Sequence, residues 1–211
     1  SNIVAEINPV AEIAALAHDA GAYVCVDGVS YAPHGFPDVG KLHADIYLFS
    51  AYKTYGPHQG IMVVRRALAE KLPNQAHYFN AEVLFKRLTP AGPDHAQIAA
   101  SAGIADYVDA LAQHHGGGDK APAEKTRFVH DLMRAHETAL LQPLLDYLSA
   151  KNSVRLLGPR QAKGRAPTVA MVLPEPGAAA AAKLAGKGVM ASGGDFYAVR
   201  CLHAQGVDPE H

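Results

Sequence analysis

Cysteine is nearly absent from this chain. Only Cys25 and Cys201 occur among 211 residues, so a framework of disulfide bonds is excluded. The fold must rest on an apolar core, and with 49% hydrophobic residues the chain can build one large domain or two small ones. Because disulfide-free proteins are typical of reducing compartments, we expect a cytoplasmic protein.

Net charge and long apolar runs are also lacking. The 19 basic and 20 acidic residues leave a formal net charge of -1, which gives no long-range attraction to nucleic acid or to an anionic membrane. The basic cluster at residues 159–165 is too short to change this. No apolar run approaches the length of a membrane span, and no basic-then-apolar leader opens the chain. We therefore expect neither nucleic-acid nor membrane partners.

Several common site motifs are missing as well. There is no G-x-G-x-x-G sequence and no Walker lysine motif, so the sequence lacks the usual markers of a nucleotide-binding α/β domain. The 12 histidines show no His-x-x-x-His spacing, and there is no Cys-x-x-Cys pair. We expect no metal site, even at the adjacent pair His114 and His115.

The first half of the chain alternates between helix and strand patterns. Residues 8–21 predict an amphipathic helix with Asn8 as N-cap, Pro9 at the first helical position and Gly21 as its stop. Short β-branched runs predict strands at 22–28, 45–51 and 60–66. Apolar spacing predicts one further helix at 94–113. This order is typical of an α/β layer architecture.

A glycine-rich stretch at residues 114–122 interrupts the pattern and predicts a domain boundary. A long helix should follow, which Pro143 should kink or split. Two strands near 153–157 and 168–173 and a small alanine-rich helix at 177–188 complete a smaller α+β unit. We assign residues 1–115 and 116–211 to the two parts.

Chemically active side chains follow two of the predicted strands. Asp27 lies at the end of the first strand. Ser50 lies at the end of the second strand, and Tyr52 and Lys53 follow it directly. Ligands of open α/β sheets bind outside the carboxyl ends of strands, so these groups can share one pocket. A lysine amine, a carboxylate and hydroxyl donors suit pyridoxal phosphate, which needs a Schiff-base lysine, a partner for its ring nitrogen and donors for its phosphate. Taken singly, Lys53 is typical of a solvated loop lysine and Asp27 of a turn residue.

These same segments resemble a known family. The stretches AEINPVAEIAALAHDAGAYVCVDGVSYAPH and ADIYLFSAYKTYGPHQG are similar to the class V aminotransferase and cysteine desulfurase-like family of fold-type I pyridoxal-phosphate enzymes. The resemblance covers residues 1–113 well and the rest loosely. It implies part of a large, mainly parallel-sheet domain that binds the cofactor, followed by a linking helix and a partial small domain. It also implies that the chain is an internal piece of a longer enzyme.

The resemblance assigns roles to individual residues. Lys53 would be the catalytic Schiff-base lysine and Asp27 the partner of the pyridine nitrogen, while Ser50 and Tyr52 would bind the phosphate. The remaining three cofactor-binding positions are Ser30 near the ring hydroxyl, Asn2 near the cofactor and the substrate carboxylate, and Gly92. Tyr52, Ser30 and Gly92 stand where the family usually has histidine, glutamine or histidine, and threonine.

The resemblance further implies a homodimer with a shared active site, because LTPAGPDH (88–95) is similar to a loop that reaches the neighbouring subunit's phosphate. The substrate would be a small amino acid, and transamination and carbon-sulfur cleavage both stay open. Cys201 stands several residues after the position of a desulfurase loop cysteine, in a stretch whose alternation predicts a strand. A non-catalytic binding domain that retains the scaffold is the alternative.

Overall fold

The computed structural model describes residues 1–89 and 92–208. The chain divides into two compact units. One unit is Pro9–Met133, and the other joins Ser1–Asn8 to Arg134–His211. The division predicted between residues 115 and 116 from the glycine-rich stretch stays a prediction.

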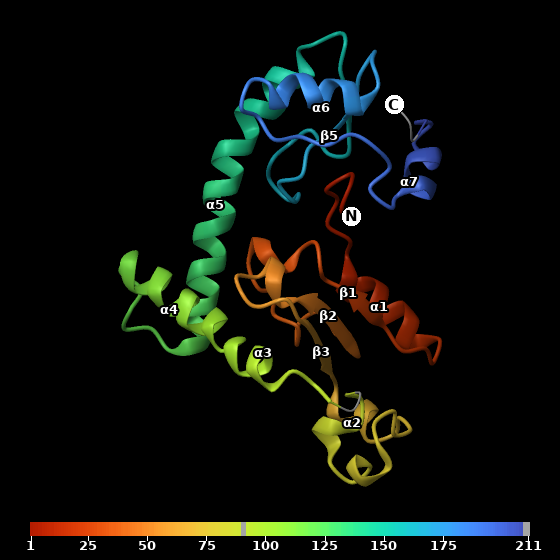
Figure 1. Cartoon of the computed structure of the whole chain (residues 1–211), viewed down its shortest axis with the longest axis vertical. Coiled ribbons are helices and arrows are strands. Elements are labelled where there is room, and N and C mark those ends of the chain that lie inside the picture. The colour runs from red at the N-terminus through yellow and green to blue at the C-terminus, as the bar shows by residue number, and fades with distance from the viewer. Residues whose placement is uncertain (90–91, 209–211) are drawn as a thin grey trace. The chain divides into compact units, whose positions relative to one another are not determined.

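A three-stranded sheet forms the centre of the Pro9–Met133 unit (Figure 1). Its strands are β1 (Cys25–Asp27), β2 (Ile46–Ser50) and β3 (Gly60–Val64), in that order. β1 and β2 run parallel and β2 and β3 run antiparallel. All three predicted strands are confirmed, although the first is shorter than predicted. Cys25, at the start of the edge strand β1, is exposed.

The helix α1 (Val10–Asp19) confirms the first predicted helix, but its start differs from the prediction. Pro9, not Asn8, is the N-cap, and no side chain caps the helix. The ψ of Pro9 is 71°, outside the helical range, so the helix begins only at Val10. The free N–H groups of its first turn are therefore too far along the chain for the side chain of Asn8 to cap them. Gly21 ends the helix as predicted, with a φ of 74°.

The predicted helix at 94–113 is two helices, α3 (His95–Ala100) and α4 (Gly103–His114). Asp94 caps α3 by accepting hydrogen bonds from the N–H groups of Ala96 and Gln97 at 3.0 and 3.1 Å. The break falls between Ser101 and Gly103, two residue types with weak helix propensity. The apolar spacing continues across the break, so spacing alone predicted one helix.

Short helices occupy the rest of this unit. They are η1 (Ala32–His34), η2 (Ala51–Lys53), α2 (Arg66–Ala69), η3 (Tyr78–Asn80) and η4 (Leu84–Lys86). Val108 and Ala112 of α4 form a small core with Val129. Val129 belongs to α5 (Pro122–Ser149), which runs through Pro143 without a break. Pro143 therefore does not split the helix, and the predicted alternative of a kink stays a prediction.

The second unit contains the part of α5 that begins at Arg134, an antiparallel strand pair and two shorter helices. The strands β4 (Arg155–Leu157) and β5 (Ala170–Val172) and the helix α6 (Gly177–Ala185) confirm the predicted elements. The other helix is α7 (Val199–Ala204). None of the helices in the described part of the chain is long and apolar enough to cross a membrane.

A buried arginine organises the loop between β4 and β5. Arg165 is 1% exposed, and its guanidinium donates hydrogen bonds to the carbonyl oxygens of Pro159, Ala166 and Thr168. These bonds replace the water that burial removes from the guanidinium. Burial also lowers the pKa of Arg165 from its ordinary value.

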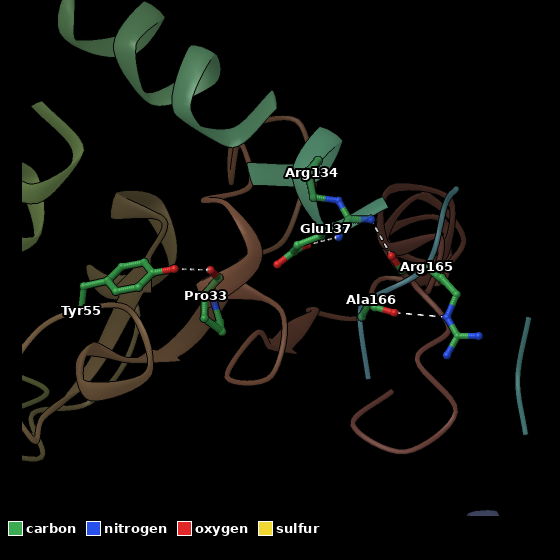
Figure 2. A network of polar contacts seen from close by, with 6 residues as sticks. All are labelled: Pro33, Tyr55, Arg134, Glu137, Arg165 and Ala166. Atoms are coloured by element: carbon green, nitrogen blue, oxygen red, sulfur yellow. Dashed lines mark hydrogen bonds and ion pairs between the residues drawn. The ribbon is translucent and has the colours of Figure 1, made fainter. Parts of the chain in front are cut away.

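The same loop is bound to the helix α5. Arg134 of α5 donates to the carbonyl oxygen of Arg165, and its guanidinium pairs with Glu137 at 2.6 Å (Figure 2). The N–H of Ala166 donates to the carbonyl oxygen of Ala5 at 2.9 Å. The amino-terminal segment, the loop and the helix are thereby joined within one unit.

Candidate active site

The parallel strands β1 and β2 bring two predicted site residues to one edge of the sheet. Asp27 is opposite Leu48 in the register, and Ser50 follows Leu48 by two residues. Because side chains alternate along a strand, Asp27, Leu48 and Ser50 lie on the same face. The carboxylate is exposed and the serine is half-buried. The structure therefore places a carboxylate and a hydroxyl near each other at the carboxyl ends of neighbouring strands.

The chain leaves β1 through a tight turn that carries Ser30. The N–H of Gly28 donates to the carbonyl oxygen of Leu48 at 2.8 Å and continues the parallel pairing. The carbonyl oxygen of Gly28 accepts from the N–H groups of Tyr31 and Ala32 at 3.0 and 2.9 Å. Ser30 is exposed within this turn, so its hydroxyl faces solvent beside the sheet edge.

Asp27 takes part in the same turn through its side chain. Its Oδ1 accepts a hydrogen bond from the N–H of Val29 at 2.9 Å. Such a bond fixes the orientation of the carboxylate and leaves its other oxygen open to a ligand.

Lys53 lies at the end of η2, directly after β2. It is exposed, and its amine makes no hydrogen bond or ion pair within residues 1–89 and 92–208. The neighbouring Ala51 and Thr54 are both 0% exposed. A free amine therefore projects from a backbone that buried neighbours hold in place.

Thr54 is a supporting residue that the sequence analysis missed. Its Oγ1 donates to the carbonyl oxygens of Ser50 and Ala51, both at 3.0 Å. The N–H of Gly56 donates to the carbonyl oxygen of Ala51 at 2.8 Å and closes the turn. A small hydroxyl residue directly after the lysine and before a glycine-proline turn was the signal that could have identified it.

Tyr52 and His58 form a stacked pair beside Lys53. Their ring centroids are 4.7 Å apart and their planes are inclined by 12°. Both side chains are exposed. Tyr52 was predicted as a site residue from the sequence, and His58 was not, because its place after the turn at Gly56 and Pro57 matches no known spacing.

Two further residues, Asn2 and Gly92, were predicted to belong to the site. Asn2 belongs to the other unit, where its Nδ2 donates to the carbonyl oxygen of Phe196 at 3.1 Å. Gly92 has a φ of 74°, and a Cβ added to it would meet nothing within 4 Å. Positions 90 and 91 of the predicted dimer loop LTPAGPDH lie outside the described residues.

Cys201 lies on a helix rather than on the predicted strand. Ala198, Cys201 and Leu202 contact one apolar cluster, at the i, i+3, i+4 spacing of a helix face. Cys201 is half-buried against this cluster. Across the residues that the structure describes, no group of three or more metal-ligating side chains occurs.

The donor set fits pyridoxal phosphate. An oriented carboxylate, a half-buried hydroxyl and an amine that has no partner among the described residues follow the carboxyl ends of β1 and β2. These are the groups that the ring nitrogen, the phosphate and the aldehyde of this cofactor require.

Comparisons with known proteins agree with this reading. Residues 1–103 match the family model for class-V aminotransferases. An aminotransferase-like protein of Gibberella zeae is 34% identical over 160 residues, which cover 75% of this chain and 36% of the relative. A probable cysteine desulfurase of Halobacterium salinarum is 33% identical over 175 residues, which cover 75% of this chain and 37% of the relative.

A solved structure shows the fold. The apo cysteine desulfurase of Thermococcus onnurineus is similar with a TM-score of 0.71 at 23% identity, over 99% of this chain and 51% of that chain. The chain thus spans just over a third of these curated relatives and about half of the solved chain. Its architecture is part of a fold-type I transferase. The chain belongs to the class V aminotransferase and cysteine desulfurase-like family of fold-type I pyridoxal-phosphate enzymes.

Proposed function

We propose that the protein is a pyridoxal-phosphate-dependent enzyme that acts on a small amino acid, as an aminotransferase or a cysteine desulfurase-like lyase, with Lys53 as its Schiff-base lysine. The observation that supports this most strongly is the shared face of Asp27 and Ser50 at the carboxyl ends of paired strands, with Lys53 following directly. The family match covers all three residues.

Each residue would have a distinct role. Lys53 would hold the cofactor through its aldehyde, and Asp27 would keep the ring nitrogen protonated. Ser50 and Tyr52 would bind the phosphate, and Ser30 would lie near the ring hydroxyl. Asn2 would serve the cofactor and the substrate carboxylate, and Gly92 would offer a backbone donor to a neighbouring subunit.

The chemistry divides between the cofactor and the chain. When bound, pyridoxal phosphate withdraws electron density from the substrate α-carbon and makes a proton there removable. The Lys53 amine would hold the cofactor and, when released from it, would be the group that moves that proton. Asp27, oriented by the N–H of Val29, would hold the charge that keeps the ring nitrogen protonated.

Other expectations form part of the same proposal. These are a cytoplasmic location, a two-fold homodimer, and the assignment of residues 1–115 to the large domain and 116–211 to the linking helix and small domain.

Borohydride reduction tests the role of Lys53. We expect the protein to show a visible absorption band with the cofactor that borohydride abolishes, and the reduced label to lie on the peptide that contains Lys53. Lys53→Ala should lack the band and lose at least about a thousandfold in turnover, since both attachment and proton transfer depend on this amine. Lys41→Ala, which removes another exposed lysine of the same unit, is the matched control and should retain both.

The same experiment separates the proposal from its alternative. A label on another lysine, or full turnover by Lys53→Ala, would show that Lys53 has no catalytic role. A protein that binds no pyridoxal phosphate at all would favour a binding domain that retains the scaffold without its chemistry.

A further inference from the structure

A buried tyrosine lies beneath the turn that carries Asp27 and Ser30. Tyr47 is 3% exposed and pairs with Val26 in the sheet, so its side chain is on the face opposite Asp27. Its hydroxyl has no hydrogen-bond partner in the described residues. The phenol of Tyr47 is therefore buried, makes no hydrogen bond in the described residues and does not face the predicted site.

The end of this ring is in contact with the first residue of the turn. A Cβ atom on Gly28 would lie 2.0 Å from Tyr47 Oη and 2.1 Å from Tyr47 Cζ. Real Cβ atoms essentially never approach other atoms so closely, so the phenol fits only because residue 28 is glycine. Tyr47 and Gly28 are thus matched in shape.

Gly28 in turn controls the path of the chain after Asp27. Its N–H is bonded to Leu48 of β2, and its carbonyl oxygen receives the N–H groups of Tyr31 and Ala32. A shift of Gly28 would move all three hydrogen bonds. It would also move the carboxylate of Asp27 on one side and the hydroxyl of Ser30 on the other.

We propose that Tyr47 is a positioning residue for Asp27, because its ring packs against Gly28 and fixes the turn from Asp27 to Ser30. The inference rests on the proposed function in one respect, namely that Asp27 contacts the cofactor. If so, the packing of Tyr47 sets how tightly the protein holds pyridoxal phosphate, although Tyr47 does not touch it.

The electrostatics of the ring agree with this role. Burial, followed by the charges of Tyr31 and Asp27, raises the pKa of Tyr47 to about 12. The phenol therefore stays neutral and brings no charge beneath Asp27. Its contribution is shape, which predicts that phenylalanine can replace it and a smaller aliphatic residue cannot.

Three variants test the proposal. Tyr47→Leu removes the ring from Gly28, and Tyr47→Phe keeps the ring without the hydroxyl. Phe49→Leu is the matched control, because Phe49 lies two residues along β2 on the same face with its ring centroid 6.2 Å from that of Tyr47. The measurements are hydrogen exchange at the N–H groups of Tyr31 and Ala32 without cofactor, and the dissociation constant of pyridoxal phosphate by absorbance titration.

We expect Tyr47→Leu to speed exchange at both N–H groups and to weaken cofactor binding, each by about tenfold or more. Tyr47→Phe and Phe49→Leu should change both quantities by less than about threefold. Equal effects of Tyr47→Leu and Phe49→Leu would reduce Tyr47 to a general core residue and overturn the proposal. Faster exchange with unchanged cofactor affinity would overturn it too.

A second variant reaches the same contact from the other side, in case Tyr47→Leu does not fold. Gly28→Ala places a methyl group against the phenol and should also weaken cofactor binding by about tenfold, whereas unchanged binding would contradict the proposal. If the unaltered protein binds no pyridoxal phosphate, the proposed function fails. The exchange measurement then still decides whether Tyr47 holds the turn.

Discussion

At the scale of single residues, Asp45 has a well-defined electrostatic environment. Its carboxylate is 7% exposed and accepts hydrogen bonds from the N–H of Val24 and from Nε2 of His18, both at 2.8 Å. The Val24 bond, followed by that of His18, lowers the pKa of Asp45 below its ordinary value. A carboxylate whose pKa is lowered by folding stabilises the fold above its unfolded pKa, and this contribution is lost as the pH falls through the folded pKa.

Replacing this carboxylate should therefore have a pH-dependent cost. We expect Asp45→Asn to lower the free energy of unfolding by about 1–3 kcal/mol at pH 7, because charge-assisted hydrogen bonds are lost. The difference from the unaltered protein should shrink below about pH 4, the ordinary pKa of aspartate. Urea unfolding at several pH values measures it. The control is Asp19→Asn, an exposed change on the same helix as His18, which should alter the free energy of unfolding by no more than about 0.5 kcal/mol. A difference between Asp45→Asn and the unaltered protein that does not vary with pH would contradict the predicted role of the carboxylate.

Cys201 illustrates how packing limits chemistry at a single residue. Its side chain is half-buried on α7 against the cluster of Ile3, Val4 and Leu157. A persulfide-carrying thiolate needs exposure and freedom to move, and a packed helix offers neither. This favours a reaction of the proposed enzyme that does not use Cys201.

The corresponding prediction is that Cys201→Ser keeps the activity toward the amino acid within about twofold, while stability falls by about 1 kcal/mol through lost packing. Sulfide release from cysteine and amino-group transfer to a keto acid are the two assays. Cys25→Ser, at the exposed cysteine, is the control. Rapid sulfide release that disappears only in Cys201→Ser would assign the sulfur acceptor to this residue.

At the scale of elements, the sequence predicted most strands and helices but not all of their limits. The three strands of the central sheet were found because their β-branched runs are bounded by turn residues. The stretch around Cys201 was predicted as a strand because apolar residues alternate there, whereas Ala198, Cys201 and Leu202 pack together at helical spacing. The apolar residues of this short segment fit both the alternation of a strand and the spacing of a helix, and only their packing against the apolar cluster decides between the two.

The same limit applies to the candidate site. Asp27, Ser50 and Lys53 could be placed at strand ends from sequence alone, because glycine and proline mark those ends. Thr54 was missed although its place before a glycine-proline turn is a local signal, since its hydrogen bonds to the carbonyl oxygens of Ser50 and Ala51 appear only in the structure. Tyr47 could not be identified, because its importance lies in its contact with Gly28, which no sequence motif marks.

The end of α1 offers a test of backbone conformation as an element-level effect. Gly21 has a φ of 74° and nothing within 4 Å of an added Cβ, while Gly103 at the start of α4 has equally open space and no positive φ. We expect Gly21→Ala to cost about 1 kcal/mol of unfolding free energy, because only the left-handed backbone is strained.

Gly103→Ala is the matched control and should be neutral or stabilising by up to about 1 kcal/mol, since alanine is the better helix former. Thermal or urea unfolding of both variants gives the comparison. Equal effects at the two glycines would show that backbone strain at Gly21 is not what ends the helix.

At the scale of the whole molecule, one segment carries a concentration of exposed aromatic side chains. Tyr78, Phe79 and Phe85 are 80%, 65% and 80% exposed. They directly precede the predicted dimer loop at 88–95 in the sequence. Exposed apolar groups that gather in one segment are typical of interaction surfaces, and this supports the proposed homodimer in which the loop reaches the neighbouring subunit's phosphate.

Subunit complementation tests that assembly. We expect Lys53→Ala to abolish the visible cofactor band, and Gly92→Glu to weaken it strongly, because Gly92 has a φ of 74° that a larger residue adopts with strain. If each site joins Lys53 of one subunit to the loop of the other, a mixed dimer contains one intact site and one doubly defective site. Refolding the two variants together in equal amounts should then restore about a quarter of the band, since about half of the dimers are mixed.

The matched control is a mixture of Lys53→Ala with a protein that carries both substitutions, which can form no intact site and should give no band. Sedimentation should show a dimer for every variant. A cofactor-saturated monomer would exclude the shared site outright. No recovery of the band in demonstrably mixed dimers would mean instead that Lys53 and the loop of the same subunit serve one site.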